Sequence, residues 1–250
     1  MPQMKRIAIV GATSSIAEHC ARNWLRAGPA ELVLIGRDAS RLQRVADDLM
    51  VRSPGSAIRV IETNMCDPDA IGRTAAHASA GGSIDVVLIA HGDLPVQAEC
   101  ETDLRRCRDA LEVNGVSPAL FAEAFAQHMA NAGHGTLAVI GSVAGDRGRK
   151  SNYAYGAAKG LVNRYLQGMQ HRFAGTAIKV VLVKPGPTDT PMTAQLKGQG
   201  APLAPVEQVA ACIVEGIAAG RPVVYAPAKW RAIMWVIRHL PGFVFNRLNI

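Results

Sequence analysis

The sequence predicts an α/β fold in which one parallel sheet of seven strands lies between two layers of helices. Short apolar runs that suit strands alternate with longer segments of helical spacing along nearly the whole chain, and this alternation is typical of βαβ units. The apolar runs are uninterrupted, as in strands that are buried on both faces. The first run passes through a turn of small residues directly into a helix, as the first βα unit of such a sheet does.

The composition predicts one domain with a large core and an anionic partner. The chain has 250 residues, of which 49% are hydrophobic and 19% charged, and its formal net charge is +7. That charge favours a nucleotide, a phosphorylated substrate or an acidic membrane surface, whereas no long Lys/Arg run indicates nucleic acid. The five cysteines lack CxxC spacing, so we expect no zinc site, no other metal site and no disulfide framework, but inert thiols in a reducing cytoplasm. The apolar runs are too short for a signal segment or a membrane-spanning helix.

The first strand and the turn after it form a candidate phosphate site. We expect a buried strand at 4–10 and a helix at 16–27. The turn between them places backbone N–H groups and the positive end of the helix dipole where a pyrophosphate would bind. One of the three usual glycines is present, and the alternative is an ordinary strand-to-helix turn. The expected contacts are Gly11, Thr13, Ser14, Ser15 and Ile16.

The end of the second strand indicates which dinucleotide the chain prefers. We expect this strand at 31–36 and a helix at 40–52. At this position an acidic residue suits the ribose 2′-hydroxyl of NAD, and an arginine suits the 2′-phosphate of NADP. Because Gly36 and Arg37 stand there, the sequence favours NADP over NAD. The alternative is that Arg37 is a solvated surface charge.

The next two strands continue the alternation. Asn64 and Met65 follow the third strand at its carboxyl end, where an adenine edge would lie, and His91-Gly92 follow the fourth strand. We expect these strands at 57–62 and 84–90, and helices at 68–78, 99–111 and 114–131.

The stretch from residue 135 to residue 159 carries the chemistry. A strand at 137–140 places Ser142 just past its end, and Tyr155 and Lys159 are four residues apart, so they share one face of a helix. A nearby ammonium lowers the pKa of a tyrosine from its ordinary value of about 10. Because a serine hydroxyl can hold a carbonyl oxygen beside that tyrosine, the three residues predict proton transfer in carbonyl/alcohol chemistry.

The last part of the chain supplies two more strands and a lid. We expect the helix that carries Tyr155 to end near Phe173, and a further helix at 206–219. Strands are expected at 177–183 and 222–226. The segment 188–205 is rich in glycine and proline and lies beyond the carboxyl end of a strand, so we expect an irregular lid.

These motifs resemble the short-chain dehydrogenase/reductase family over nearly the whole chain. The sequence GATSSIA near the N-terminus, then Asn114, Ser142, Tyr155-x-x-x-Lys159 and Pro185-Gly186-x-x-x-Thr190, follow that family's order and are near its spacing. The resemblance implies a Rossmann-type, doubly wound sheet, an NAD(P)-dependent oxidoreductase and a homo-oligomer.

The resemblance also implies a role for each motif residue. Tyr155 would be the general acid/base, Lys159 would lower its pKa and hold the nicotinamide ribose, and Ser142 would bind the substrate oxygen. Asn114 would help to position a proton-relay water. The implied cofactor contacts in this half are Gly92, Tyr155, Lys159, Pro185, Gly186, Thr188 and Thr190.

The chain departs from the family pattern in three places. Ile89-Ala90-His91-Gly92 stands where the family has Asn-Asn-Ala-Gly. Two of the three glycines of the nucleotide turn are replaced, and Thr188 replaces a branched aliphatic residue. The expected reaction class is unchanged, but the contacts near the first and fourth strands are less well defined.

Two segments, 145–160 and 223–250, resemble a smaller group within the family. This group comprises the reductases of decaprenylphosphoryl-2-keto-erythro-pentose, which work with a flavin oxidase. The resemblance implies that the substrate is the 2-keto pentose of a polyprenyl-phosphate-linked sugar. Three cations between Ser142 and Tyr155 would grip its phosphate at the mouth of the site. These are Arg147, Arg149 and Lys150, for which the alternatives are a solvated turn or a subunit contact.

The C-terminus forms a tail that differs from the rest of the chain. We divide the chain into a domain, 1–228, and a tail, 229–250, that packs on it or extends from it. The tail mixes large apolar residues with Lys229, Arg231, Arg238 and Arg247. This mixture suits a segment that lies in a membrane interface without spanning the membrane, and the alternative is burial against a partner subunit.

The sequence therefore predicts a reductase in which Tyr155 protonates the alkoxide that forms from a ketone. A soluble ketone, a steroid-like alcohol or a 3-oxoacyl thioester is the alternative substrate. A catalytically idle nucleotide-binding scaffold is the alternative function, and the presence of Tyr155 together with Lys159 argues against it. We expect the protein in the cytoplasm, at the inner face of the membrane.

Overall fold

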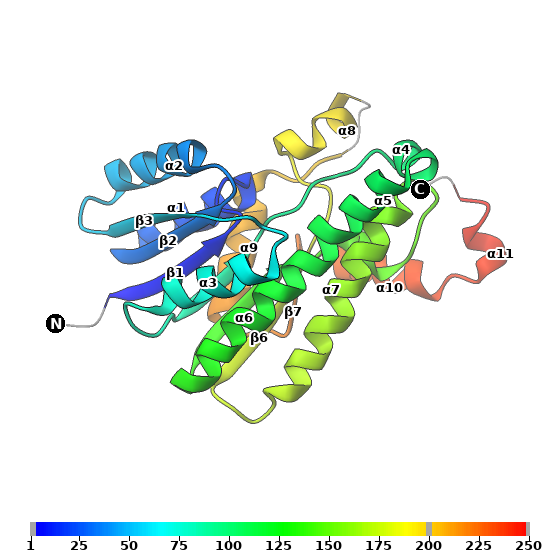
Figure 1. The fold of residues 1–250 in the computed structure, drawn as a ribbon. Coiled ribbons are helices and arrows are strands. Elements are labelled where there is room, and N and C mark those ends of the chain that lie inside the picture. Colours follow the sequence, from blue (N-terminus) through cyan, green and yellow to red (C-terminus); the bar gives the residue numbers. More distant parts are fainter. Residues whose placement is uncertain (1–3, 199–201, 249–250) are drawn as a thin grey trace.

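One parallel sheet organises the molecule. The computed structural model describes residues 4–198 and 202–248, and its strands lie in the order β3-β2-β1-β4-β5-β6-β7 (Figure 1). All neighbouring strands are parallel, as the sequence predicts. The strands are β1 (Lys5–Val10), β2 (Ala30–Gly36), β3 (Ala57–Glu62), β4 (Val86–Ile89), β5 (Gly135–Ile140), β6 (Ile178–Pro185) and β7 (Val223–Ala226).

The strand order reverses at the centre of the sheet. β1 pairs with β2 on one side and with β4 on the other, so that Val10 lies beside both Ile35 and Ile89. The connections that leave β1 and β4 diverge from this point to opposite halves of the sheet. In open α/β sheets a crevice opens beyond the carboxyl ends of such strands, and ligands bind there.

Helices cover both faces of the sheet. Alternate residues of β1 point to opposite faces: Ile7 and Ile9 belong to one apolar core, and Ala8 and Val10 to the other. Helices α1, α2 and α9 pack on the first core, and α3, α6 and α7 on the second; the second group lies in front of the sheet in Figure 1. The bounds are α1 (Ser15–Ala27), α2 (Ala39–Arg52), α3 (Pro68–Ser79), α6 (Ser117–Ala132), α7 (Tyr153–Arg172) and α9 (Val206–Ala218).

The helix predicted at 99–111 is interrupted. It forms α4 (Gln97–Thr102) and α5 (Leu104–Leu111), because the Asp103 carboxylate accepts a hydrogen bond from the backbone N–H of Arg105 at 2.8 Å and starts a new helix. After α5 the chain makes one π-helical turn, η1 (Glu112–Val116). The helix predicted to begin at Asn114 therefore begins at Ser117, and Asn114 lies in the π turn.

The segment predicted as an irregular lid contains two short helices. After β6 the chain forms the 3₁₀ turn η3 (Pro191–Thr193) and α8 (Ala194–Gly198). Thr188 and Ala204 form an isolated parallel bridge. In Figure 1, α8 lies at the carboxyl edge of the sheet, between α2 and α4. Residues 199–201 of the predicted lid lie outside the described residues.

The tail forms two helices, α10 (Trp230–His239) and α11 (Gly242–Phe245), at one end of the molecule (Figure 1). Met234 is buried, and the Trp230 indole packs directly on Gly186, where an added Cβ would lie 1.9 Å from Trp230 Nε1. The tail thus packs on the carboxyl end of β6. Within residues 4–198 and 202–248, no helix has the length and apolar character needed to cross a bilayer.

Candidate active site

Two adjoining cavities open at the carboxyl edge of the sheet. The first has a volume of about 820 Å³ and lies beyond β1, β2 and β3. The second, of about 580 Å³, lies beyond β4, β5 and β6. Both are lined by Ser14, Ile16, His91, Gly92 and Thr190, so they form one continuous cleft.

The first cavity collects the predicted nucleotide residues. Gly11 adopts a φ of +78°, and a Cβ there would lie 2.5 Å from His91 N, so this close turn requires glycine. The Ser14 side chain makes no capping hydrogen bond at the start of α1, which leaves the first N–H groups of that helix available to an anion. The predicted residues that line this cavity are Gly11, Thr13, Ser14, Ser15, Ile16, Arg37, Asn64, Met65 and Gly92.

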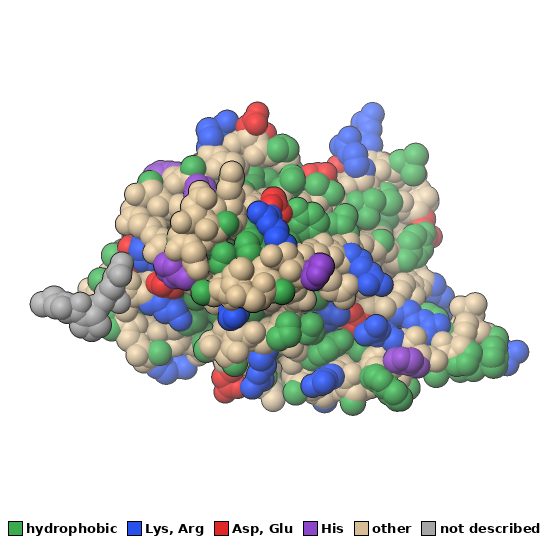
Figure 2. All heavy atoms as spheres, turned by 90° about the horizontal axis from the view of Figure 1, so that it is seen from below, with side chains coloured by type: hydrophobic (Ala, Val, Ile, Leu, Met, Phe, Trp, Pro, Cys, Tyr) green, Lys and Arg blue, Asp and Glu red, His purple; other side chains and the backbone are tan. Residues whose placement is uncertain are grey.

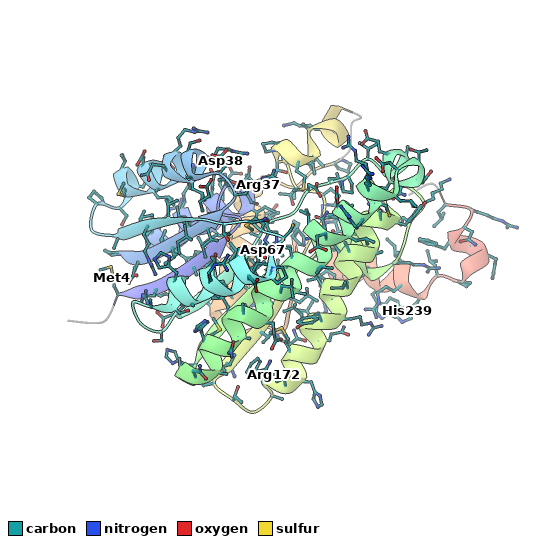
Figure 3. The ribbon with its side chains drawn as sticks, viewed as in Figure 1. Met4, Arg37, Asp38, Asp67, Arg172 and His239 are labelled. Atoms are coloured by element: carbon teal, nitrogen blue, oxygen red, sulfur yellow. The ribbon has the colours of Figure 1, made fainter. Side chains whose placement is uncertain are left out.

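Two arginines lie at the adenosine end of the first cavity. Arg37 and Arg41 both line it, and neither guanidinium has an ion pair or hydrogen bond with another residue in the described part of the chain. Figure 3 shows Arg37 and Asp38 where β2 leads into α2. The Asp38 carboxylate accepts hydrogen bonds from Arg41 N (2.9 Å) and Ser40 Oγ (2.8 Å), which lower its pKa. Asp38 therefore caps α2, and the sequence analysis missed Arg41, although a second cation one turn after Arg37 is visible in the sequence.

The second cavity brings together the four predicted catalytic residues, Asn114, Ser142, Tyr155 and Lys159. Ser142 Oγ accepts a hydrogen bond from Ala144 N at 3.1 Å and thereby starts the 3₁₀ turn η2 (Val143–Asp146). Tyr155 and Lys159 lie on one face of α7, with Lys159 Nζ 5.7 Å from the Tyr155 ring centroid. The buried Lys159 ammonium donates a hydrogen bond to the Ile140 carbonyl at 3.1 Å.

The pKa values of this pair correct one prediction. Burial raises the pKa of Tyr155 to about 12, against a hydrogen bond with Ser142 that lowers it. Burial also lowers the pKa of Lys159 to about 8. The expected lowering of the Tyr155 pKa by Lys159 is therefore not seen, because desolvation is the largest effect on this hydroxyl.

Asn114 is fully buried, and its amide is occupied by protein groups. Its Nδ2 donates to Asp93 Oδ1 at 2.6 Å and to the Ala110 carbonyl at 3.0 Å. Its Oδ1 accepts from Asp93 N at 3.0 Å. A one-turn π-helix often marks a functional position, and here it directs Asn114 toward the chain that leaves β4. The sequence analysis missed Asp93, whose signal is its place directly after Gly92.

The remaining predicted cofactor residues line the second cavity from β6 and the segment after it. They are Pro185, Gly186, Thr188 and Thr190. The Thr188 hydroxyl donates to the Gly186 carbonyl at 2.9 Å. Thr190 and Thr193 form a reciprocal capping box at η3, so this wall of the cleft is held by its own hydrogen bonds.

The structure separates the three cations that were predicted to grip a phosphate. Arg149 lines the second cavity, but Arg147 and Lys150 do not. Arg147 Nη1 donates to the carbonyls of Ile237 (2.6 Å) and Leu240 (2.7 Å), and its guanidinium lies 3.8 Å from the ring centroid of Phe245. Arg147 therefore anchors the tail, and Lys150 is exposed to solvent.

A buried network holds the loop that joins Ser142 to α7. The Asp146 carboxylate accepts from Lys184 Nζ at 2.5 Å, from the Tyr225 hydroxyl at 2.9 Å and from Asn163 Nδ2 at 3.3 Å. Lys184 is at the end of β6 and Tyr225 in β7. This network ties the loop to two strands and to α7.

His91 connects the two halves of the cleft. Its Nε2 lies 2.8 Å from Ser117 Oγ, and Ser117 Oγ donates to the Met65 carbonyl at 2.5 Å. Since the serine proton points to Met65, His91 Nε2 is the donor. Burial lowers the pKa of His91 to about 3, so this ring is neutral near pH 7.

Comparisons with known proteins agree with this arrangement. The family described as short chain dehydrogenase matches residues 5–200. An uncharacterized oxidoreductase of Streptomyces coelicolor is 30% identical over 249 residues, which are 98% of this chain and 96% of that protein. An uncharacterized oxidoreductase of Mycobacterium tuberculosis is 32% identical over 244 residues, covering 97% and 96%. A short chain dehydrogenase from Burkholderia cenocepacia, solved in complex with NADP, superposes with a TM-score of 0.83 at 19% identity and covers 99% of this chain and 98% of its own.

Proposed function

Because the chain belongs to the short-chain dehydrogenase/reductase family, we propose that it is an NADPH-dependent reductase of a ketone that carries a phosphate group. The family makes it an NAD(P)-dependent oxidoreductase, and the substrate and the roles of single residues are our proposal. The finer form of the proposal is the 2-keto pentose of a polyprenyl-phosphate-linked sugar, formed by a flavin oxidase.

The residues of the first cavity fit a phosphorylated dinucleotide. The first N–H groups of α1, which no side chain caps, suit a pyrophosphate. The unpaired guanidiniums of Arg37 and Arg41 suit the 2′-phosphate of NADP. Gly92, Thr190, Tyr155 and Lys159 would hold the nicotinamide end. When bound, NADPH supplies the hydride that reduces the ketone carbon.

The residues of the second cavity supply the proton and hold the substrate oxygen. Ser142 would donate a hydrogen bond to the carbonyl oxygen, which gains negative charge during reduction. Tyr155 would transfer its hydroxyl proton to that oxygen, giving the alcohol and a phenolate. The Lys159 ammonium would stabilise the phenolate, and Asn114 would help to order the water through which Tyr155 is protonated again.

The environment of Arg149 is the observation that supports a phosphate group on the substrate. Arg149 lines the same cavity as Ser142 and Tyr155, and its guanidinium has no ion pair or hydrogen bond with another residue in the described ranges. Burial lowers the pKa of Arg149, so the charge is partly desolvated and uncompensated. A partly buried charge without a partner is unfavourable, and an anionic group of the substrate would compensate it.

An activity assay tests this proposal. Wild-type protein should reduce a flavin-oxidised polyprenylphosphoryl pentose with NADPH in preference to neutral soluble ketones. Arg149→Ala should raise KM for the phosphorylated ketone about ten- to hundredfold, since a hydrogen bond to a charged group contributes roughly 1.5–3 kcal/mol.

The same substitution should leave KM for a neutral ketone unchanged. Lys150→Ala is the matched control, because this cation is one residue away and outside the cavity. Equal loss with both ketones, or none with either, would contradict the role of Arg149.

The tail supports a second part of the proposal, contact with an anionic membrane surface. Trp235 and Phe243 are 65% and 70% exposed, and residues 216–250 contain no Asp or Glu. Figure 2 shows hydrophobic and basic side chains side by side at the end of the molecule formed by α10 and α11. Four basic residues near an anionic leaflet would contribute about 1 kcal/mol each.

Vesicle sedimentation tests the membrane contact. We expect the wild-type protein to sediment with phosphatidylglycerol vesicles more than with phosphatidylcholine vesicles, and the double variant Trp235→Ala/Phe243→Ala to lose most of that binding. Both side chains are exposed, so the fold should be kept. Leu104→Ala is the control, since Leu104 is also exposed and lies on α5. If the double variant binds vesicles normally but dissociates an oligomer in gel filtration, the tail is a subunit contact instead.

A further inference from the structure

Asp93 is an acidic residue at the junction of the two cavities. It lines the first cavity, while its partner Asn114 lines the second. The residues that line the cleft include two carboxylates, Glu62 and Asp93. Glu62 is at the end of β3, where it accepts a hydrogen bond from Ala39 N at 3.2 Å. Asp93 is therefore the carboxylate of the cleft that is hydrogen-bonded to a residue of the catalytic cavity, Asn114.

The two hydrogen bonds between Asp93 and Asn114 hold this carboxylate in place. One runs from the Asn114 amide to the carboxylate (2.6 Å), and the other from the Asp93 backbone to the Asn114 carbonyl oxygen (3.0 Å). The third contact, from Asn114 to the Ala110 carbonyl at 3.0 Å, prevents the amide from turning away. The other carboxylate oxygen of Asp93 has no hydrogen bond with a residue in the described part of the chain.

Gly92 brings this hydrogen-bonded pair, Asp93 and Asn114, close to Lys159. A Cβ on Gly92 would lie 2.7 Å from Asn114 Oδ1 and 3.5 Å from Lys159 Nζ, so both atoms border the same small space. Lys159 makes its hydrogen bond to a neutral carbonyl, and within the described ranges it has no ion pair. The buried ammonium therefore has no carboxylate in direct contact among the described residues.

The other titratable groups around the pair do not provide that charge. Tyr155 is a neutral phenol near pH 7, His91 is neutral, and Arg149, which lines the second cavity, is positive. Glu112 and Asp109 act on Cys66 and not on Lys159. Asp93 raises the pKa of Lys159, which burial lowers. It also raises the pKa of Tyr155, which burial raises as well.

We propose that Asp93 is a positioning residue of this site, whose carboxylate, clasped by Asn114, keeps the Lys159 ammonium charged at neutral pH. This inference rests on the proposed role of Tyr155 and Lys159 as the proton-transfer pair. Two substitutions separate the effect of the Asp93 charge from that of its hydrogen bond with Asn114. Asp93→Asn removes the charge and keeps an oxygen that can accept from Asn114, whereas Asp93→Ala removes both.

The pH dependence gives the sign of the effect. Loss of a negative charge favours neutral lysine and ionised tyrosine, so the pKa of each group falls. Ketone reduction needs both groups protonated, so the alkaline limb of kcat/KM should move to lower pH in Asp93→Asn, by on the order of one pH unit. Asp93→Ala should show the same shift and also a lower kcat over the whole pH range, because Asn114 loses its partner.

The titration of Lys159 in the protein without cofactor tests the inference independently of turnover. NMR of labelled lysine side chains, with the Lys159 signal assigned from Lys159→Met, should show titration at lower pH in Asp93→Asn than in wild type. Asp109→Asn is the matched control, because it removes the same charge as Asp93→Asn but from α5. It should leave the titration of Lys159 unchanged. An unchanged Lys159 titration in Asp93→Asn would overturn the inference, and so would a wild-type kcat in Asp93→Ala. Absence of ketone reduction by the wild type would instead overturn the proposed function.

Discussion

Tyr155→Phe is expected to bind NADPH nearly as wild type and to lose turnover by roughly a hundred- to ten-thousand-fold, which is the usual contribution of a positioned proton donor. The substitution removes the hydroxyl that lies with Ser142 and Lys159 in the second cavity. It keeps the ring, so the packing of α7 should be unchanged. Steady-state kcat and titration of NADPH fluorescence measure the two effects separately.

Tyr153→Phe is the control for this prediction. Tyr153 lies on the same helix two residues earlier and is about half exposed (47%), and its i+4 neighbour is Ala157, which carries no charge. We expect wild-type kcat in this variant. Comparable activity in Tyr155→Phe would mean that another group donates the proton.

Arg37→Ala and Arg41→Ala are expected to change the preference for the dinucleotide. Each should raise KM for NADPH about tenfold, and together about hundredfold, because each removes one charge-assisted contact to the 2′-phosphate. KM for NADH should change little, since NADH lacks that phosphate. The ratio of the two KM values, measured with one ketone, gives the result.

Arg44→Ala is the matched control for the cofactor prediction. Arg44 is on α2 with Arg41, but it lines a neighbouring hollow beside Glu18 and Asp48 and not the first cavity. Its removal lowers the positive charge of the same helix without removing a proposed contact. If all three variants shift the ratio equally, the preference comes from the general field of α2, and the assignment of Arg37 and Arg41 is wrong.

The parts of the site that lie within one strand–turn–helix unit could be predicted from the sequence. Ser142 lies two residues after the end of β5, and the four-residue spacing of Tyr155 and Lys159 fixes them on one face of α7. Strand geometry and helix geometry alone determine these positions. The seven strands could also be predicted from the sequence, because their apolar runs are continuous.

Features that depend on residues far apart in the sequence could not be predicted. Arg147 is 90 residues from Ile237, so nothing in its own segment indicates that it faces the tail and not the cleft. Asp93 and Asn114 are 21 residues apart and meet because of the π turn. The pKa of Tyr155 was predicted in the wrong direction, because the spacing shows the nearby ammonium but not the burial of the hydroxyl.

The network at Asp146 has a consequence for how the site reaches its working geometry. Ser142 and Tyr155 lie at opposite ends of one loop, and this loop is fastened at its middle to Lys184, Tyr225 and Asn163. The separation of the oxygen-binding hydroxyl from the proton donor is therefore set when the chain folds, before any substrate arrives. A preorganised pair of this kind needs little reorganisation energy during the reaction.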